Sequence, residues 1–88
     1  MEKQWVVYIL RCKDGSLYTG ITDNLPRRLA LHRAGKGAKY TRGRDPLVLA
    51  YLEACDDHSQ ALRREIVIKR LPKAKKQKLC ENCIIKAL

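Results

Sequence analysis

Apolar residues fall into three strand-like runs along the chain. The runs Gln4–Cys12 (QWVVYILRC), Ser16–Thr22 and Leu47–Cys55 (LVLAYLEAC) are rich in β-branched, aromatic and aliphatic residues, which is typical of strands. The tripeptide KDG between the first two runs predicts a β-hairpin. We therefore expect two antiparallel strands at the start of the chain and a third strand after residue 46.

Helical patterns separate and follow these strands. Asn24 is typical of a helix N-cap and Gly35 of the residue after a helix end, so a helix is expected between them. The residues DDHSQ offer caps for a second helix, over residues 59–71, and a last, basic helix begins at Pro72.

The resulting order ββαβαα, with its antiparallel hairpin, predicts a small α+β domain. We expect one domain over residues 1–79 and a short C-terminal tail over residues 80–88, because no repeat or long linker divides the 88 residues. No apolar run reaches the about 18 residues that span a bilayer, and the N-terminus lacks a signal-peptide pattern. These features predict a cytoplasmic protein with no membrane partner.

Positive charge is concentrated in two blocks of the sequence. The net charge is +10, and residues 27–44 carry +7 of it without one acidic residue. Residues 58–78 carry a further +7, and residues 45–57 carry −4. This distribution favours a polyanionic partner, nucleic acid before anionic membrane, over a basic surface that only keeps the protein soluble.

The loop GKGAKYTRGR combines glycines, cations and a tyrosine. It does not match the Walker pattern, which argues against nucleoside triphosphate binding. A flexible backbone with guanidinium groups suits phosphodiester contacts, and an aromatic ring can stack on a base. The candidate nucleic-acid-binding residues, including one on the preceding helix, are Arg27, Lys36, Lys39, Tyr40, Arg42 and Arg44.

Four cysteines raise the question of a disulfide framework or a metal site. Without a secretion signal, free thiols are the better interpretation. Cys80 and Cys83 form one C-x-x-C pair, but a zinc site needs a second pair at matching spacing, which isolated Cys12 and Cys55 do not supply. Small buried side chains or incidental tail residues are favoured, and the role of the C-x-x-C pair stays open.

Two expected helices carry polar residues on apolar faces. Leu25, Arg28, Leu29 and His32 share one face of the first helix. For Arg28 an inward and a snorkelling orientation are about equally favoured, whereas His32 alone is expected at the edge of the face.

On the second helix, Glu65 lies in a row with Ala61 and Ile68. An ion pair along the helix, for example with Lys69, is the simpler interpretation. The alternative is a metal ligand, since a partly buried carboxylate suits a hard cation such as Mg²⁺.

The hairpin register decides whether two tyrosines share a face. A two-residue turn pairs Tyr8 with Ile21 and places Tyr18 on the other face. A three-residue loop with Gly15 in the left-handed conformation pairs Tyr8 with Gly20 and places both tyrosines on the same face. The local sequence suits either turn.

Several ordered motifs resemble the GIY-YIG nuclease family. They are VVY at residues 6–8, YTG at 18–20, RLALH at 28–32, and Glu65 on a later helix. The stretches DGSLYTG, KGAKYTRGR and ALRREIVIKRL resemble the small stand-alone members, and the likeness covers residues 5–76. Val6 replaces the named glycine and Thr19 the named isoleucine, but both tyrosines and Gly20 are kept.

The resemblance implies a three-stranded antiparallel sheet flanked by helices, and phosphodiester hydrolysis with one divalent metal, Mg²⁺ or Mn²⁺. In such a site Glu65 would hold the metal and Arg28 would stabilise charge on the phosphate. Tyr8 and Tyr18 would share two roles, activating or orienting water and positioning water or phosphate. His32 matches a residue that assists in some members. A tyrosine, with an ordinary pKa of about 10, is a poor base unless the arginine and the metal favour its anion.

The functional interpretation requires both tyrosines on one face, so we expect the three-residue hairpin loop. The leading function is a metal-dependent DNA endonuclease, structure-selective in repair or recombination, with RNA as an alternative substrate. Because the chain has no room for a targeting domain, we expect either that a partner protein supplies specificity or that specificity is low. The alternatives are a nucleic-acid-binding module without activity, and a redox or zinc protein built on the C-x-x-C pair.

Overall fold

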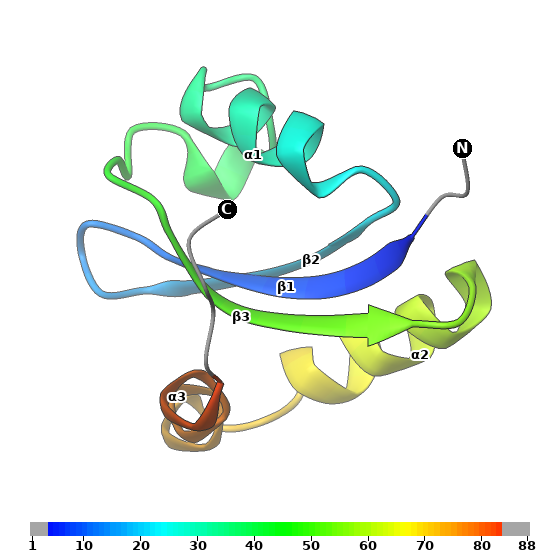
Figure 1. The fold of residues 1–88 in the computed structure, drawn as a ribbon. Helices are drawn as coiled ribbons and strands as arrows, with labels where there is room; N and C mark the ends of the chain where they lie inside the picture. The colour runs from blue at the N-terminus through cyan, green and yellow to red at the C-terminus, as the bar shows by residue number, and fades with distance from the viewer. Residues whose placement is uncertain (1–3, 84–88) are drawn as a thin grey trace.

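A computed structural model describes residues 4–83 as an antiparallel sheet with helices on both faces (Figure 1). The strand order is β2-β1-β3, so the first strand lies in the centre. The expected α+β fold and the order ββαβαα are confirmed. The elements are β1 (Trp5–Arg11), β2 (Leu17–Thr22), α1 (Leu25–Arg33), a 3₁₀ turn η1 (Lys39–Thr41), β3 (Val48–Cys55), α2 (His58–Lys69) and α3 (Lys73–Asn82).

The central strand β1 is buried on both faces, because successive side chains of a strand point to opposite sides. Val7 and Ile9 pack into one cluster with α2 and α3 residues. Val6, Tyr8 and Leu10 pack into the other cluster, which includes Leu29 of α1. Figure 1 shows α1 on one face of the sheet and α2 and α3 on the other. The sheet thus separates two thin cores, and Tyr8 belongs to the α1 side.

The hairpin has the three-residue loop. Tyr8 pairs with Gly20 and Leu10 with Tyr18. Gly15 has a φ of 81°, in the left-handed region that favours glycine. Both tyrosines therefore project from the same face of the sheet, as the functional interpretation requires.

Helix ends follow the expected capping chemistry. The Asn24 side chain accepts a hydrogen bond from the backbone N–H of Arg27 at 3.2 Å, and Gly35 follows α1 with a φ of 73°. At the start of α2 the Asp57 side chain accepts from the backbone N–H of Gln60 at 2.8 Å. Within residues 4–83 no helix is long and apolar enough to cross a membrane.

The last helix extends beyond the expected domain boundary at residue 79. Helix α3 continues to Asn82, and Cys80 is buried in the cluster with Val7 and Ile68. The side chain of Cys80 therefore belongs to the core, and the helix continues past residue 79 to keep it there. The rest of the expected tail, residues 84–88, lies outside the described residues.

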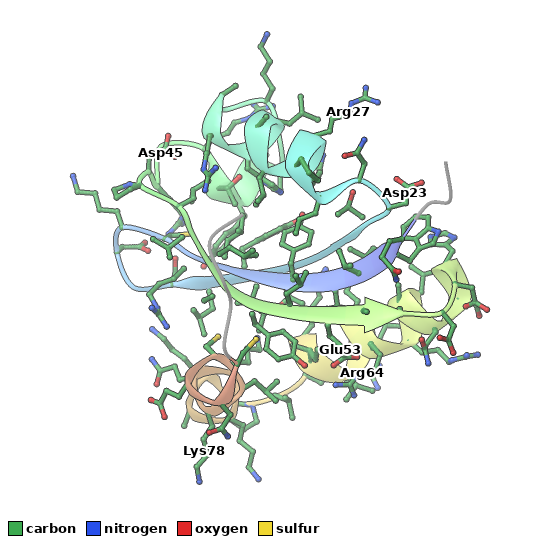
Figure 2. The ribbon with its side chains drawn as sticks, viewed as in Figure 1. Asp23, Arg27, Asp45, Glu53, Arg64 and Lys78 are labelled. Atoms are coloured by element: carbon green, nitrogen blue, oxygen red, sulfur yellow. The ribbon has the colours of Figure 1, made fainter. Side chains whose placement is uncertain are left out.

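A polar network joins β3 to α2 beside this core. Arg64 donates to both carboxylate oxygens of Glu53, at 2.6 and 2.9 Å, and the Tyr51 hydroxyl donates to the same carboxylate at 2.6 Å. Figure 2 shows Glu53 and Arg64 facing each other between the two elements. Bidentate contacts of this kind fix the orientation of one element on another.

Candidate active site

Tyr8 and His32 meet beneath α1. Tyr8 is fully buried, His32 is 1% exposed, and the hydroxyl oxygen of Tyr8 lies 2.8 Å from Nε2 of His32. His32 points inward because it shares a helix face with Leu29, which packs into the cluster around Tyr8. The expectation that His32 lies at the edge of this face is therefore wrong.

The loop after α1 closes over the other side of the imidazole. Nδ1 of His32 lies 2.9 Å from the hydroxyl oxygen of Thr41, which is itself 1% exposed. That hydroxyl donates to the carbonyl oxygen of Ala38 at 2.9 Å. A continuous chain of hydrogen bonds thus runs from β1 through α1 to η1.

Two glycines make room for this chain of hydrogen bonds. A Cβ at Gly20 would lie 2.6 Å from the Tyr8 hydroxyl oxygen, and one at Gly37 would lie 2.5 Å from Nδ1 of His32. The ring of Tyr8 therefore lies against the backbone of β2, and the loop backbone lies against the imidazole. The sequence candidates omit Gly37 and Thr41. One feature of the sequence could have indicated Gly37. It follows closely after Gly35, although Gly35 alone is enough to end the helix.

Tyr18 lies at the centre of an aromatic group. Its ring centroid is 5.4 Å from that of His32, 6.4 Å from that of Tyr8 and 5.9 Å from that of Tyr40. Tyr40 is 43% exposed, and the guanidinium carbon of Arg44 lies 4.4 Å from the centroid of its ring. The two sequence-predicted tyrosines and the histidine therefore come together, with Tyr40 at their outer edge.

Arg28 extends from α1 to both hydroxyls. Its pKa is raised, first by hydrogen bonding to the Tyr8 hydroxyl and also by Tyr18. Half-buried, it lines a hollow of about 190 Å³ with Arg27 and residues at the end of β2. Arg27 itself is exposed, and Figure 2 shows it extending outward from the helix. The neighbouring arginines thus divide between an inward and an outward orientation.

Burial sets the protonation of the two central residues. Desolvation raises the pKa of Tyr8 to about 12, and this outweighs the opposing effect of Arg28. Desolvation, followed by the charge of Arg28, lowers the pKa of His32. At neutral pH Tyr8 is a phenol and His32 a neutral imidazole. The arginine alone does not produce the tyrosine anion.

Glu65 on α2 adds a negative charge near this group. Its side chain is 19% exposed, lies 3.4 Å from the ammonium of Lys69, and contributes to the raised pKa of Tyr8. The ion pair expected along the helix is present. Mg²⁺ is commonly held by one or two carboxylates together with waters and substrate phosphates, so a half-buried carboxylate is a donor that fits this ion. Glu65 does not line the hollow beside Arg28.

Other metal chemistry finds no support. Across residues 4–83 no group of three or more His, Cys, Asp or Glu side chains could hold a metal ion. All four cysteines are free thiols, and three are buried. Burial raises the pKa of the Cys80 thiol, which makes the reactive thiolate less available. A zinc site at the C-x-x-C pair therefore lacks further ligands in the described part of the chain, and the raised pKa of Cys80 disfavours a redox role.

The candidate nucleic-acid-binding residues lie around the same face. Arg27, Lys36, Lys39 and Arg42 are exposed. Arg44 differs, because it forms an ion pair with Asp14 at the hairpin tip while it covers Tyr40. The backbone N–H of Lys13 also donates to the carbonyl of Arg44 at 2.8 Å. Arg44 thus holds the loop to the hairpin in addition to presenting charge.

Comparison with known proteins places this arrangement in a family. Residues 4–78 match the model of the GIY-YIG catalytic domain. The chain belongs to the GIY-YIG family. The GIY-YIG chain is thus a member of a nuclease family, and Tyr8, Tyr18 and Glu65 lie within the matched residues.

Relatives of this GIY-YIG chain are small proteins of similar length. The UPF0213 protein OB0043 of Oceanobacillus iheyensis is 53% identical over 81 residues, which cover 92% of this chain and 94% of the relative. The UPF0213 protein VNG_2274C of Halobacterium salinarum is 52% identical over 73 residues, covering 83% and 95%. Such names assign no activity.

Solved structures agree with the GIY-YIG fold described here. The solution structure of the UPF0213 protein BH0048 from Bacillus halodurans is 47% identical, has a TM-score of 0.58, and is matched over 89% of this chain and 83% of that one. That of EF2693 from E. faecalis is 34% identical with a TM-score of 0.62, matched over 99% and 96%.

Proposed function

We propose that this chain is a metal-dependent endonuclease that hydrolyses phosphodiester bonds in DNA. One observation carries the proposal: Tyr8, Tyr18, Arg28 and His32, from three separate elements, form one contact group within the GIY-YIG match. Two phenols, an imidazole and a guanidinium that lines a small hollow can together bind a phosphate and move a proton. A purely structural core has no need of this combination.

Arg28 would act on the phosphate. Its guanidinium faces both tyrosine hydroxyls and borders the hollow at the end of β2. A fixed cation at the point where negative charge develops stabilises the transition state without reorganisation of solvent. Tyr18, half-buried between the core and Tyr40, would position the phosphate or the attacking water.

Tyr8 and His32 would move the proton of the attacking water. The raised pKa of Tyr8 makes direct abstraction by a preformed anion unfavourable. Instead the phenol oxygen takes the water proton while its own proton passes to Nε2 of His32, 2.8 Å away. The hydroxide equivalent joins phosphorus and the leaving oxygen departs, so Tyr8 ends neutral and His32 ends as a cation.

Glu65 would hold the divalent ion, Mg²⁺ or Mn²⁺. When bound, such an ion supplies positive charge that stabilises the phosphate. Before binding, Glu65 must exchange its Lys69 partner, which lies 3.4 Å away and is itself half-exposed. Occupation would also cancel the negative charge by which Glu65 raises the pKa of Tyr8.

The exposed cations would hold the substrate backbone. Arg27, Lys36, Lys39 and Arg42 are exposed on α1 and the loop that follows it, and cations of this kind make binding fall steeply with salt. Tyr40 would stack on a base only after Arg44 leaves its ring. Contacts to phosphate rather than to base edges suit selection of DNA structure, as in repair or recombination, with a partner protein adding specificity.

Cleavage of branched, single-stranded and duplex DNA, and of matched RNA, in Mg²⁺ or Mn²⁺ tests the proposal. Arg28→Gln and Glu65→Gln should each lower cutting by at least about 100-fold. Arg33→Gln and Glu81→Gln make the same charge changes at exposed positions and should cut like the wild type. Equal cutting by all five proteins would refute the assignment.

A binding module without activity is the second candidate, and the Glu65–Lys69 ion pair favours it. In that case all five proteins would bind DNA, with salt-dependent affinity, and none would cut it in either metal. Cutting by the wild type that is lost in Glu65→Gln would exclude a binding module, because such a module does not depend on this carboxylate.

A further inference from the structure

The loop between α1 and β3 contains one buried polar residue among its exposed cations. Thr41 is 1% exposed, whereas its neighbours Tyr40 and Arg42 are exposed. We propose that Thr41 is a positioning residue, whose hydroxyl fixes the proton of His32 on Nδ1 and leaves Nε2 free to accept the proton of Tyr8. The catalytic consequence rests on the proposed nuclease function, but the proton assignment does not.

The assignment follows from counting protons at Thr41. A hydroxyl has one proton, and that of Thr41 is donated to the carbonyl oxygen of Ala38 at 2.9 Å. The same hydroxyl oxygen lies 2.9 Å from Nδ1 of His32. Since the hydroxyl has no second proton to give, Nδ1 must be the donor. A neutral imidazole has one N–H, so Nε2 must be an acceptor.

The proton of Tyr8, at the other end of the hydrogen-bonded chain, favours the same tautomer of His32. The Tyr8 oxygen faces the guanidinium of Arg28, which is a donor only. The cationic guanidinium near Tyr8 offers no acceptor for the phenol proton, which leaves that proton available for Nε2 of His32, 2.8 Å away. With the proton of His32 on Nε2 instead, the buried proton of Tyr8 would lose this acceptor.

The surroundings hold the imidazole in this orientation. Tyr8, His32 and Thr41 are all at most 1% exposed, so water does not compete for their hydrogen bonds. The backbone of Gly37 lies so close that an added Cβ would approach Nδ1 to 2.5 Å. The ring has little room to flip, and its tautomer is therefore set by its two partners.

The tautomer decides whether Tyr8 can release its proton. With Nε2 unprotonated, the Tyr8 proton can move to His32, and Nδ1–H keeps its acceptor on Thr41 while the imidazole is charged. With Nε2 protonated, His32 could only donate to Tyr8, and the transfer would be blocked. Thr41 acts through His32 and has no contact with substrate in this scheme.

Nitrogen NMR of the imidazole tests the assignment directly. His58, exposed and stacked on Trp5, is the second histidine, and a His58→Gln spectrum identifies the signals of His32. We expect the neutral His32 of the wild type to be protonated on Nδ1. Thr41→Ser, which keeps the hydroxyl, should retain this tautomer, and Thr41→Val, which lacks it, should gain the Nε2-protonated form. Protonation of Nε2 in the wild type, or the same tautomer in all three, would overturn the proposal.

Cleavage by the same variants tests the consequence. Thr41→Val should lower the single-turnover rate by about 10- to 100-fold, part of the 10²–10⁴ that proton transfer supplies, with little change in DNA affinity. Thr41→Ser should recover most of the rate. Equal rates for the valine and serine variants would refute a positioning role. If no protein cuts DNA, the nuclease proposal fails while the NMR result still decides the tautomer.

Folding of the valine variant is checked by its thermal melt. If Thr41→Val is unfolded, Thr41→Cys replaces it, because a thiol has similar size and is a weak hydrogen-bond partner. A cysteine variant that is folded and still protonated only on Nδ1 would count against the proposal.

Discussion

Replacing Gly20 by alanine tests whether the Tyr8 ring is held against β2. At a compatible position this change stabilises a protein by about 0.4–1 kcal/mol, because alanine restricts the unfolded chain. Here the new Cβ would lie 2.6 Å from the Tyr8 hydroxyl oxygen and 2.7 Å from Cζ. Ordinary contacts between such atoms are about 3.5–4.0 Å, so the ring would have to move by about 1 Å.

The Tyr8 ring cannot make this movement freely. It is fully buried and tied to His32 at 2.8 Å. Overpacking of a tight core costs about 1–3 kcal/mol. We therefore expect Gly20→Ala to lower the free energy of unfolding by about 1–2 kcal/mol rather than raise it. In a domain of this size that corresponds to about 4–8 °C of Tm per kcal/mol. A displacement of about 1 Å in the site should also lower cutting by up to about 100-fold.

Urea unfolding of four proteins forms the assay: wild type, Gly20→Ala, Tyr8→Phe and the double variant. Tyr8→Phe removes the nearest atom and the tie to His32, so the ring can shift. Gly20→Ala should then cost about 1 kcal/mol less than in the wild type, within the usual range for residues in contact. A stabilising Gly20→Ala, or an equal cost in both backgrounds, would refute the reasoning.

Three further predictions concern stability. The hydroxyl oxygen of Thr19 is buried with no hydrogen-bond partner within residues 4–83, so Thr19→Val should raise the free energy of unfolding by about 1 kcal/mol, and a loss on chemical denaturation would contradict this. The lowered pKa of His32 means that, as pH falls below its ordinary value of 6.5, the unfolded chain takes up a proton before the folded one. Stability should therefore fall from pH 7 to pH 5 more steeply in the wild type than in His32→Gln, and parallel urea midpoints would exclude the effect. Arg64 lowers the pKa of Glu53, so this pair stabilises the fold above the ordinary pKa of 4.5 and the contribution is lost as pH falls further. Arg64→Gln should cost at most about 1 kcal/mol at pH 7, because the arginine is 37% exposed, and nothing near pH 2; an equal cost at both pH values would show that the pairing is not the cause.

Much of the fold was predictable because it depends on neighbours in the chain. Asn24 and Gly35 mark the ends of α1 through capping and a left-handed φ, which are local effects. The hairpin needed one more piece of information. Its tripeptide suits two turns, and only the requirement that Tyr8 and Tyr18 share a face selected the observed register.

The candidate site was predictable by motif and not by chemistry. Spacing placed Arg28 and His32 on one helix face, and the family motifs supplied Tyr8, Tyr18 and Glu65. Residue patterns could not show that desolvation raises the pKa of Tyr8 to about 12 despite the adjacent arginine. That balance depends on how deeply the fold buries the ring.

The sequence by itself determined the order of elements, the helix ends and the motif residues, because these follow from periodicity and local backbone chemistry. Tertiary structure alone decided that His32 is buried, that Gly37 lies against its ring and that the Thr41 hydroxyl lies within hydrogen-bond distance of Nδ1. The loop reaches His32 because it is tied to the hairpin tip, through Asp14 and the backbone of Lys13. Hydrogen bonds between segments distant along the chain leave no periodic trace in the sequence, so their partners emerge only when the chain is folded.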